Sequence, residues 1–265
     1  MAQEKYSTLR LERDGPVRRV VLNRPEVRNA FDDEMIRELT NVFASLSEEP
    51  GARAVVLSGE GKTFCAGADV NWMRRAAAYS RDENLNDARR MARMLRTIDT
   101  CSRPVLGQIR GAAMGGGVGL AAVCDVVVAA EDTVFSLAEV KLGILPAAIS
   151  PFVLRAIGAR QARDFFLTGD RFGAEEARRI GLVHRVVPAG ELENAISDKL
   201  SSLLTSGPEA VAAAKRLIET VAGRDIDGVF EATSEAIADR RASAEGREGL
   251  SAFLEKRKPS WSGSK

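Results

Sequence analysis

The stretch Pro104–Pro146, PVLGQIRGAAMGGGVGLAAVCDVVVAAEDTVFSLAEVKLGILP, decides how the rest of the chain is organised. Two apolar runs typical of buried strands, Val105–Ile109 and Asp125–Ala130, flank a helix start rich in glycine. The glycines concerned are Gly115, Gly116, Gly117 and Gly119. Each glycine inside a helix costs roughly 0.5–1 kcal/mol relative to alanine. The cluster therefore indicates either that something approaches the backbone closely or that the helix packs through a small-residue face, and this stretch alone leaves both open.

A second segment, Val55–Val70, has the same design as Val105–Leu120: a buried strand, a loop of glycine and alanine, and then a helix. A helix N-terminus offers unpaired N–H groups and partial positive charge, which suit an anion or a developing oxyanion. Neither segment has the spacing GxxxxGK[ST] or GxGxxG that nucleotide phosphates require. The sequence thus disfavours a nucleotide-binding module.

The remainder of the chain alternates strand and helix patterns. Ser7–Glu12 and Val17–Leu22 predict a hairpin, Ala54–Leu57 predicts a strand buried on both faces, and Asp32 is placed to cap a helix. A helical pattern follows at about Asn71–Tyr79, and Thr133–Ser136 predicts another short strand. From Ile149 onward the pattern is almost wholly helical, interrupted by a short strand within Gly181–Pro188. Strands that alternate with helices predict an α/β core with right-handed crossovers.

Composition excludes several classes of function. The 265 residues carry 38 Lys and Arg against 37 Asp and Glu, so no global field attracts nucleic acid or an anionic membrane. The three cysteines, Cys65, Cys101 and Cys124, lack CxxC spacing, which favours free thiols in a reducing compartment and no metal site. The first residues lack an apolar segment, and no run is long enough to span a membrane. We expect a cytoplasmic protein with no nucleic-acid partner.

Glu139 is the residue whose neighbours in the sequence favour a catalytic role. The only histidine, His184, lies in an apparent strand and is expected to be structural, and no GxSxG elbow is present. Glu139 stands between apolar residues; if these face the core, burial raises its pKa toward the range useful for acid–base catalysis. The alternative is a surface glutamate paired with Lys141 or an arginine.

Several motifs in order resemble the enoyl-CoA hydratase/isomerase (crotonase) superfamily over about Thr8–Trp261. They are Leu22–Pro25 with Asn29-Ala30, Phe64–Asp69, Gly111–Gly117, Cys124-Asp125, Glu139 with Leu142-Gly143 and Pro146, and Phe253–Pro259. The resemblance implies a crotonase-like ββα spiral core over residues 1–200, carrying the acyl-CoA site. It also implies a C-terminal helical trimerisation region over residues 201–265, and a homotrimer or homohexamer.

The resemblance also assigns roles to individual residues. The N–H groups of Ala68 and Gly116 would form an oxyanion hole for the thioester carbonyl of an acyl-CoA, with Glu139 as acid and base. The remaining expected positions in the substrate and coenzyme A surface are Val27, Arg28, Ala66, Asp69, Gly115, Gly119, Phe253 and Lys256, the last two possibly from a neighbouring subunit. Coenzyme A would be part of the substrate, so no separate cofactor or metal is expected.

Gly119 departs from the two-acid hydratases of this superfamily, which carry a glutamate there. A lone glutamate at the Glu139 position also occurs in enoyl-CoA isomerases, which need a single base to move a proton. A simple copy of the two-glutamate mechanism is therefore in doubt.

Finer resemblance, in Asp69–Arg75 and Gly115–Leu120, favours bacterial methylglutaconyl-CoA hydratases of leucine degradation. The implied reaction is reversible hydration of 3-methylglutaconyl-CoA to 3-hydroxy-3-methylglutaryl-CoA. Arg74 or Arg75 is then a candidate for binding the distal carboxylate, although a solvated helix face explains either residue. The alternatives are an isohexenylglutaconyl-CoA hydratase, an enoyl-CoA delta-isomerase, and a non-enzymatic protein that binds acyl-CoA or RNA.

Overall fold

The computed structural model describes residues 6–262, and its centre is a six-stranded sheet. The sheet order is β1-β2-β3-β4-β6-β9, and every neighbouring pair is parallel except the β1–β2 hairpin. The strands are β1 (Leu9–Asp14), β2 (Val17–Leu22), β3 (Ala54–Gly59), β4 (Val105–Ile109), β6 (Val126–Ala130) and β9 (Arg185–Val187). The α/β class expected from the sequence is confirmed.

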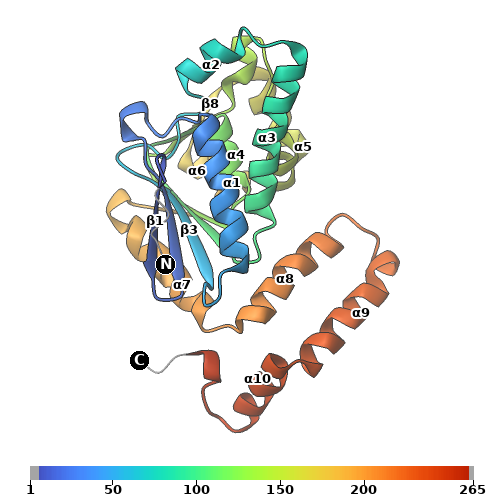
Figure 1. The fold of residues 1–265 in the computed structure, drawn as a ribbon. Helices are drawn as coiled ribbons and strands as arrows, with labels where there is room; N and C mark the ends of the chain where they lie inside the picture. Colours follow the sequence, from blue (N-terminus) through green and yellow to red (C-terminus); the bar gives the residue numbers. More distant parts are fainter. Residues whose placement is uncertain (1–5, 263–265) are drawn as a thin grey trace.

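Helices cover both faces of this sheet, which explains why β6 is apolar throughout and β3 is apolar from Ala54 to Leu57. In β3, Val55 and Leu57 belong to the core beneath α1 (Asp33–Glu48) and α3 (Arg81–Asp99). Their neighbours Ala54 and Val56 point to the opposite face, where α7 (Leu192–Leu204) packs. Asp32 caps α1 as expected, its carboxylate accepting a hydrogen bond from the Met35 N–H. Figure 1 shows α1 and α3 side by side against the sheet.

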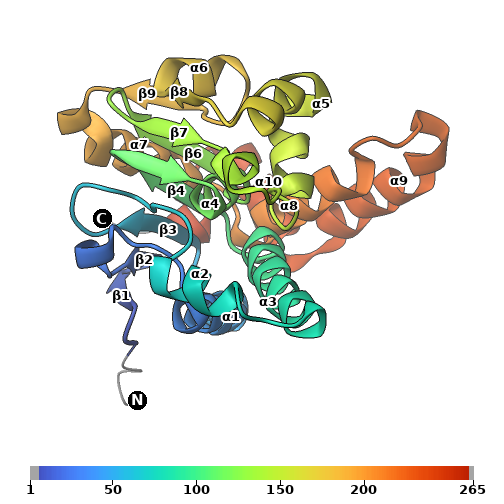
Figure 2. The same cartoon turned by 90° about the horizontal axis from the view of Figure 1, so that it is seen from above.

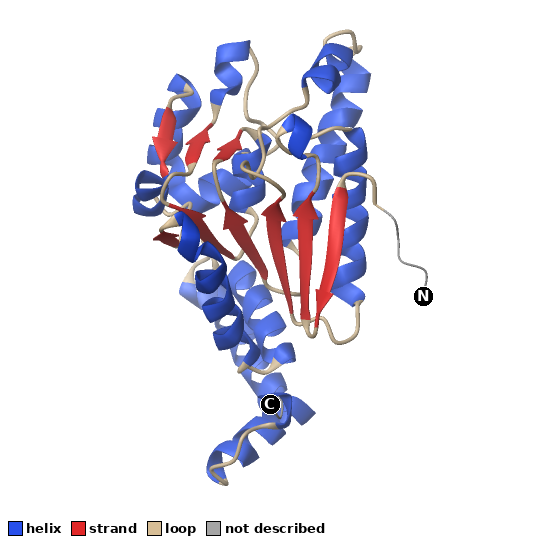
Figure 3. Cartoon of the chain, turned by 90° about the vertical axis from the view of Figure 1, so that its left-hand side faces the viewer, coloured by secondary structure: helices blue, strands red, loops and turns tan. Residues whose placement is uncertain are grey.

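A small second sheet lies beyond the ends of the main strands, and the sequence predicted only its strand at Thr133–Ser136. Its order is β5-β7-β8, formed by β5 (Ala112–Met114), β7 (Val134–Ser136) and β8 (Arg171–Gly173). Figure 3 shows these short strands past the tips of the main-sheet arrows. The three-residue strands β5 and β8 carry too little alternation to be recognised from sequence.

The loops and helices around the small sheet complete the core. The elements not yet given are η1 (Pro25–Val27), α2 (Val70–Ala76), α4 (Gly116–Ala122), η2 (Ala138–Leu142), α5 (Ser150–Thr168), α6 (Ala174–Arg179) and η3 (Ala189–Glu191). The helix expected at about residues 71–79 ends earlier, at Ala76. Within residues 6–262, no helix combines the length and the apolar character that crossing a bilayer demands.

Three C-terminal helices project from the core, as Figures 1 and 2 show. They are α8 (Pro208–Val221), α9 (Ile226–Ala242) and α10 (Ala244–Leu254), followed by η4 (Ser260–Ser262). The division expected between residues 200 and 201 falls inside α7, which packs on the sheet, so the structural change comes after Leu204. Large apolar side chains are exposed along these helices, among them Ile226, Phe230, Ile237 and Phe253. Such exposure suits a subunit interface, and trimerisation stays a prediction.

Candidate active site

Backbone pairing holds the two glycine-rich loops side by side. Cys65, in the first loop, forms a parallel bridge with Ala113 of β5 and exchanges hydrogen bonds with Ala112 and Met114, at 3.1 and 2.9 Å. Phe31 forms a second bridge with Ala68, through bonds from the Phe31 N–H to Gly67 and from the Asp69 N–H to Phe31. The start of α4 and the turn before α2 are therefore fixed relative to each other.

Two backbone N–H groups at this junction are unused. Ala68 lies just before α2, and Gly116 is the first residue of α4, where no preceding turn supplies an acceptor. Neither N–H donates a hydrogen bond to any residue that the structure describes, whereas the adjacent Gly115 N–H donates to Ser136 at 2.8 Å. Both residues line one cavity, together with Glu139. The sequence-predicted oxyanion pair and the predicted acid are thus brought together.

The glycines at the start of α4 permit close approach. A Cβ on Gly115, whose φ is +50°, would lie 2.9 Å from Oε1 of Glu139. A Cβ on Gly116 would lie 2.7 Å from the Phe31 ring and 2.9 Å from the Met91 methyl group. These contacts resolve the ambiguity left by the sequence. Gly115 makes room for the carboxylate of Glu139, while Gly116 makes room for apolar packing.

Glu139 lies on η2 and is half-buried. Burial disfavours its charged form and raises the pKa of the carboxyl above its usual value. Its Oε2 atom is buried and has no hydrogen-bond partner within residues 6–262. Lys141, the alternative partner considered from the sequence, pairs with Asp170 at 3.5 Å instead. A carboxyl with a raised pKa and an unpaired oxygen is suited to exchanging protons with a ligand.

The cavity around Glu139 has a volume of about 130 Å³ and is otherwise apolar. Its wall consists of Phe31, Ala68, Trp72, Met91, Gly116, Glu139, Leu145, Pro146, Ala147, Ala148 and Ile149. Glu139 is the one charged side chain among these residues. The cavity therefore suits a short acyl group whose carbonyl oxygen meets the two free N–H groups.

Gly119 has a structural explanation. A Cβ at this position would lie 2.3 Å from Cγ2 of Ile149 and 3.6 Å from a methyl group of Leu95. Ile149, which lines the cavity, occupies the space that a side chain at residue 119 would need. The glycine is thus a packing requirement here, and no second acid can enter from this position without moving Ile149.

The first loop positions its expected substrate residues mainly through backbone contacts. The Ala66 N–H donates to Arg28 at 3.0 Å, which places the exposed Arg28 and the neighbouring Val27 beside that loop. Asp69 is used structurally: its carboxylate accepts from the Asn71 and Trp72 N–H groups and pairs with Arg24 at 3.0 Å. Burial alone would raise the pKa of Asp69, but these bonds outweigh it and lower the pKa. Its carboxylate is therefore a helix cap for α2, and contact of this residue with coenzyme A stays a prediction.

Four other predicted residues do not reach the cavity in this chain. Phe253 is 80% exposed, and it and Lys256 belong to the α10 end of the molecule, opposite α2 in Figure 1. Within one chain they cannot complete the site, so such a role requires a neighbouring copy. Arg75 pairs with Asp33 at 2.7 Å, and Arg74 bonds Asn71 at 3.1 Å. Neither arginine lines the cavity.

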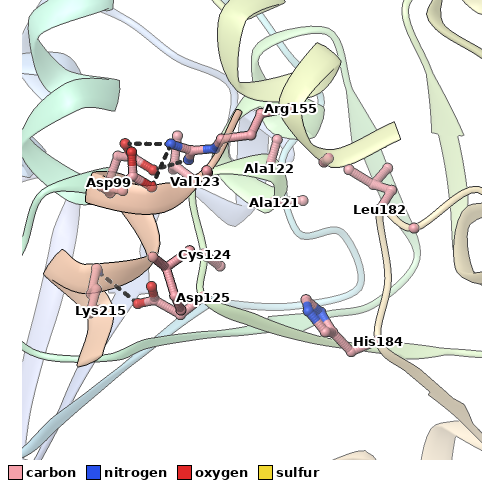
Figure 4. Close-up of a pocket in the computed structure, with 15 residues that line it drawn as sticks. Asp99, Ala121, Ala122, Val123, Cys124, Asp125, Arg155, Leu182, His184 and Lys215 are labelled. Carbon is pink, nitrogen blue, oxygen red and sulfur yellow. Dashed lines mark hydrogen bonds and ion pairs between the residues drawn. The ribbon is translucent and has the colours of Figure 1, made fainter. Parts of the chain in front are cut away.

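A larger cavity, of about 280 Å³, lies between the core and α8, and Figure 4 shows why it is a less suitable site. Lys215 pairs with Asp125 at 2.7 Å, and Arg155 pairs with Asp99 and Glu219. His184 lines this cavity, and its Nδ1 accepts a hydrogen bond from the Val127 N–H at 3.0 Å, in keeping with a structural histidine. None of the cavity's described side chains has a buried polar atom left unpaired.

The cysteines do not provide a nucleophile. All three are free and buried, and burial raises the pKa of Cys65 to about 12 and that of Cys124 as well. Within residues 6–262 no cluster of three metal-ligating side chains occurs. Sequence reasoning missed Trp72, Met91 and Ile149 as cavity walls. Trp72 was available as a tryptophan four residues after Ala68, whereas the other two carry no local signal.

Comparison with known proteins identifies relatives along nearly the whole chain. The sequence model of the family described as "Enoyl-CoA hydratase/isomerase" matches residues 12–264. A solved enoyl-CoA hydratase from Shewanella pealeana is 38% identical, with a TM-score of 0.94 and 97% of each chain covered. AtuE of Pseudomonas aeruginosa is 39% identical, with a TM-score of 0.94, covering 97% of this chain and 100% of that one. A short-chain-enoyl-CoA hydratase of Clostridium acetobutylicum is 31% identical over 94% of this chain and 95% of its own.

Proposed function

Because this chain belongs to the enoyl-CoA hydratase/isomerase family and is an enzyme of the enoyl-CoA hydratase type, we propose that it hydrates 3-methylglutaconyl-CoA reversibly to 3-hydroxy-3-methylglutaryl-CoA with one acid–base residue. The observation that carries the one-acid mechanism is the composition of the cavity. Glu139 is its one charged wall residue, and Ile149 fills the space in front of Gly119. The substrate is supported by the local sequence pattern from Asp69 to Arg75.

Hydration proceeds in two proton transfers through Glu139. Its carboxylate takes a proton from water while the water oxygen bonds to C3, and the double-bond electrons move toward the thioester. The Ala68 and Gly116 N–H groups stabilise the resulting enolate oxygen; losing one such donor typically costs about 3–4 kcal/mol of barrier. Glu139 then returns the proton to C2. Addition on one face of the double bond is the expected stereochemistry, because a single carboxyl serves both steps.

The distal carboxylate of this substrate is expected outside the cavity, whose only charge is the Glu139 carboxylate. Arg75 lies one helical turn after Trp72 and hence near the same side of α2, whereas Arg74 points away from that side. Its partner Asp33 is exposed, so exchanging it for a substrate carboxylate costs little. We assign carboxylate binding to Arg75.

Purified protein is assayed with 3-methylglutaconyl-CoA, with crotonyl-CoA, which lacks the distal carboxylate, and with a 3-enoyl-CoA. The proposal expects loss of enoyl-thioester absorbance and the highest kcat/KM with 3-methylglutaconyl-CoA. Arg75→Gln should raise KM for that substrate about tenfold and leave crotonyl-CoA unaffected. Arg74→Gln is the matched control and should change neither value. Equal rates with both enoyl thioesters would contradict the substrate assignment.

Isomerisation of 3-enoyl-CoA is the second candidate, favoured by the single carboxyl in the cavity. An isomerase needs a base that moves one proton between two carbons, and Glu139 meets that requirement without a bound water. Turnover of the 3-enoyl-CoA with no hydration of either 2-enoyl thioester would select this activity.

A further inference from the structure

Trp72 lines the active-site cavity and carries a buried hydrogen-bond donor that no contact yet explains. The residue lies one turn after Ala68, and the start of its helix is fixed by Asp69 and Arg24. Its Nε1 atom is buried and has no hydrogen-bond partner within residues 6–262. Leaving a buried donor unpaired costs about 1–3 kcal/mol, and folded proteins tolerate few such groups.

Half of such unpaired atoms belong to residues of the active-site cavity. Four buried side-chain nitrogen or oxygen atoms are unpaired in the part of the chain that the structure describes. Two belong to Arg53 and Arg103, whose other guanidinium nitrogens donate to backbone carbonyls. The other two, Nε1 of Trp72 and Oε2 of Glu139, both belong to walls of the 130 Å³ cavity. One is a donor and the other is an acceptor when the carboxyl is ionised.

The charge of the cavity indicates what this pair binds. No cation lines the wall, so a second anion beside Glu139 would be buried without compensation. A neutral hydroxyl or water has the hydrogen-bonding capacity to satisfy such a pair, since its hydrogen donates to a carboxylate and its oxygen accepts from an indole N–H. A hydrocarbon acyl chain, by contrast, would leave the indole N–H unpaired.

We propose that the Trp72 indole N–H holds the water that adds to C3, and in the reverse direction the hydroxyl that leaves it. This inference deepens the proposed hydration, on which it rests, by supplying a second group that orients the reacting oxygen. In hydration the oxygen forms its bond to C3, one of its protons passes to Glu139, and that proton is later delivered to C2. Trp72 gains and loses no proton; it orients the oxygen and stabilises negative charge that develops on it during departure.

The test separates water addition from proton removal. Hydration of 3-methylglutaconyl-CoA and crotonyl-CoA is measured beside deuterium exchange at the α-carbon of butyryl-CoA, which needs Glu139 and the oxyanion donors but adds no water. Trp72→Phe should lower kcat for hydration about tenfold while KM and the exchange rate stay within twofold of wild type. Trp261→Phe is the matched control, because the Trp261 N–H donates to Thr205 at 3.2 Å, outside this cavity.

Two results with the Trp72→Phe variant would overturn the inference. If hydration and exchange fall together in Trp72→Phe, the residue only supports the shape of the site; if hydration is unchanged, its N–H has no part in the reaction. If the wild-type protein hydrates crotonyl-CoA and not 3-methylglutaconyl-CoA, the proposed substrate is wrong. The effect of Trp72→Phe on hydration and exchange is then measured with crotonyl-CoA. Absence of hydration with both enoyl thioesters would overturn both proposals.

Discussion

The active-site cavity and the cavity beside α8 differ in a way that their volumes and charged side chains alone do not reveal. The larger one, of about 280 Å³, is bordered by two aspartates, a glutamate, an arginine, a lysine and the only histidine, yet its charged groups are paired. The smaller one, of about 130 Å³, is almost wholly apolar, but two of its wall residues each carry a buried polar atom without a partner. Paired charges stabilise a docked helix, whereas unpaired polar atoms are available to a ligand. In this protein, buried polar atoms without hydrogen-bond partners therefore distinguish the reactive site better than cavity size or charge does.

The largest effect expected from this comparison is on catalysis. Glu139→Gln removes the exchangeable proton of the small cavity and should lower kcat about 1000-fold, since general acid–base catalysis contributes about 10²- to 10⁴-fold. Initial rates with 3-methylglutaconyl-CoA and crotonyl-CoA measure this change. Glu131→Gln, at an exposed position, is the control and should retain full activity. Full rate in Glu139→Gln would refute its acid–base role.

At the larger cavity we expect the opposite phenotype: a substitution lowers the free energy of unfolding and leaves the catalytic rate unchanged. Lys215→Met leaves Asp125 partly buried without its ammonium partner and should lower the free energy of unfolding by about 1–3 kcal/mol. Urea denaturation measures the loss, and kcat of the folded protein should be unchanged. Lys199→Met, on an exposed position of α7, should stay within about 0.5 kcal/mol of wild type. Lost activity at full stability would make this cavity functional after all.

A substitution at Gly119 tests whether packing against Ile149 or the reaction itself requires a glycine at this position. Gly119→Ala gains up to about 1 kcal/mol of helix propensity, but its Cβ overlaps Ile149, and overpacking costs about 1–3 kcal/mol. We expect net destabilisation of about 1–2 kcal/mol in thermal or urea unfolding. The double variant with Ile149→Ala should be more stable than the sum of the single changes, because removing Cγ2 relieves the overlap. Additive effects would exclude this packing explanation.

The smallest effect is a pH dependence of stability. Because burial raises the folded-state pKa of Glu139, its protonated form favours the native state, and this contribution is lost as pH rises through the folded pKa. Glu139→Gln should therefore unfold at a slightly higher temperature than wild type near pH 8. The difference should shrink as pH falls to the unfolded pKa of about 4.5. A difference that grows at acid pH would contradict the raised pKa.

Much of the fold could be predicted locally. The apolar runs of β2 and β4 match their strands residue for residue, and Asp32 caps α1 as its position indicated. Of the small sheet, only the strand at Thr133–Ser136 was predicted, because three-residue strands depend on neighbours far away in the chain. The division expected after residue 200 lies within α7, because packing on the sheet and not composition separates α7 from α8.

The sequence by itself determined the α/β class, the two strand–loop–helix segments and the acid Glu139, because periodicity and glycine placement are local properties. Only the tertiary structure decided that Ala68, Gly116 and Glu139 share one cavity, and that Ile149 fills the space before Gly119. It also separated Phe253 and Lys256 from that cavity within one chain and left the buried N–H of Trp72, a wall residue of the cavity, without a partner. Those properties depend on which distant side chains meet, and the contacts that set them are absent from any local stretch of sequence.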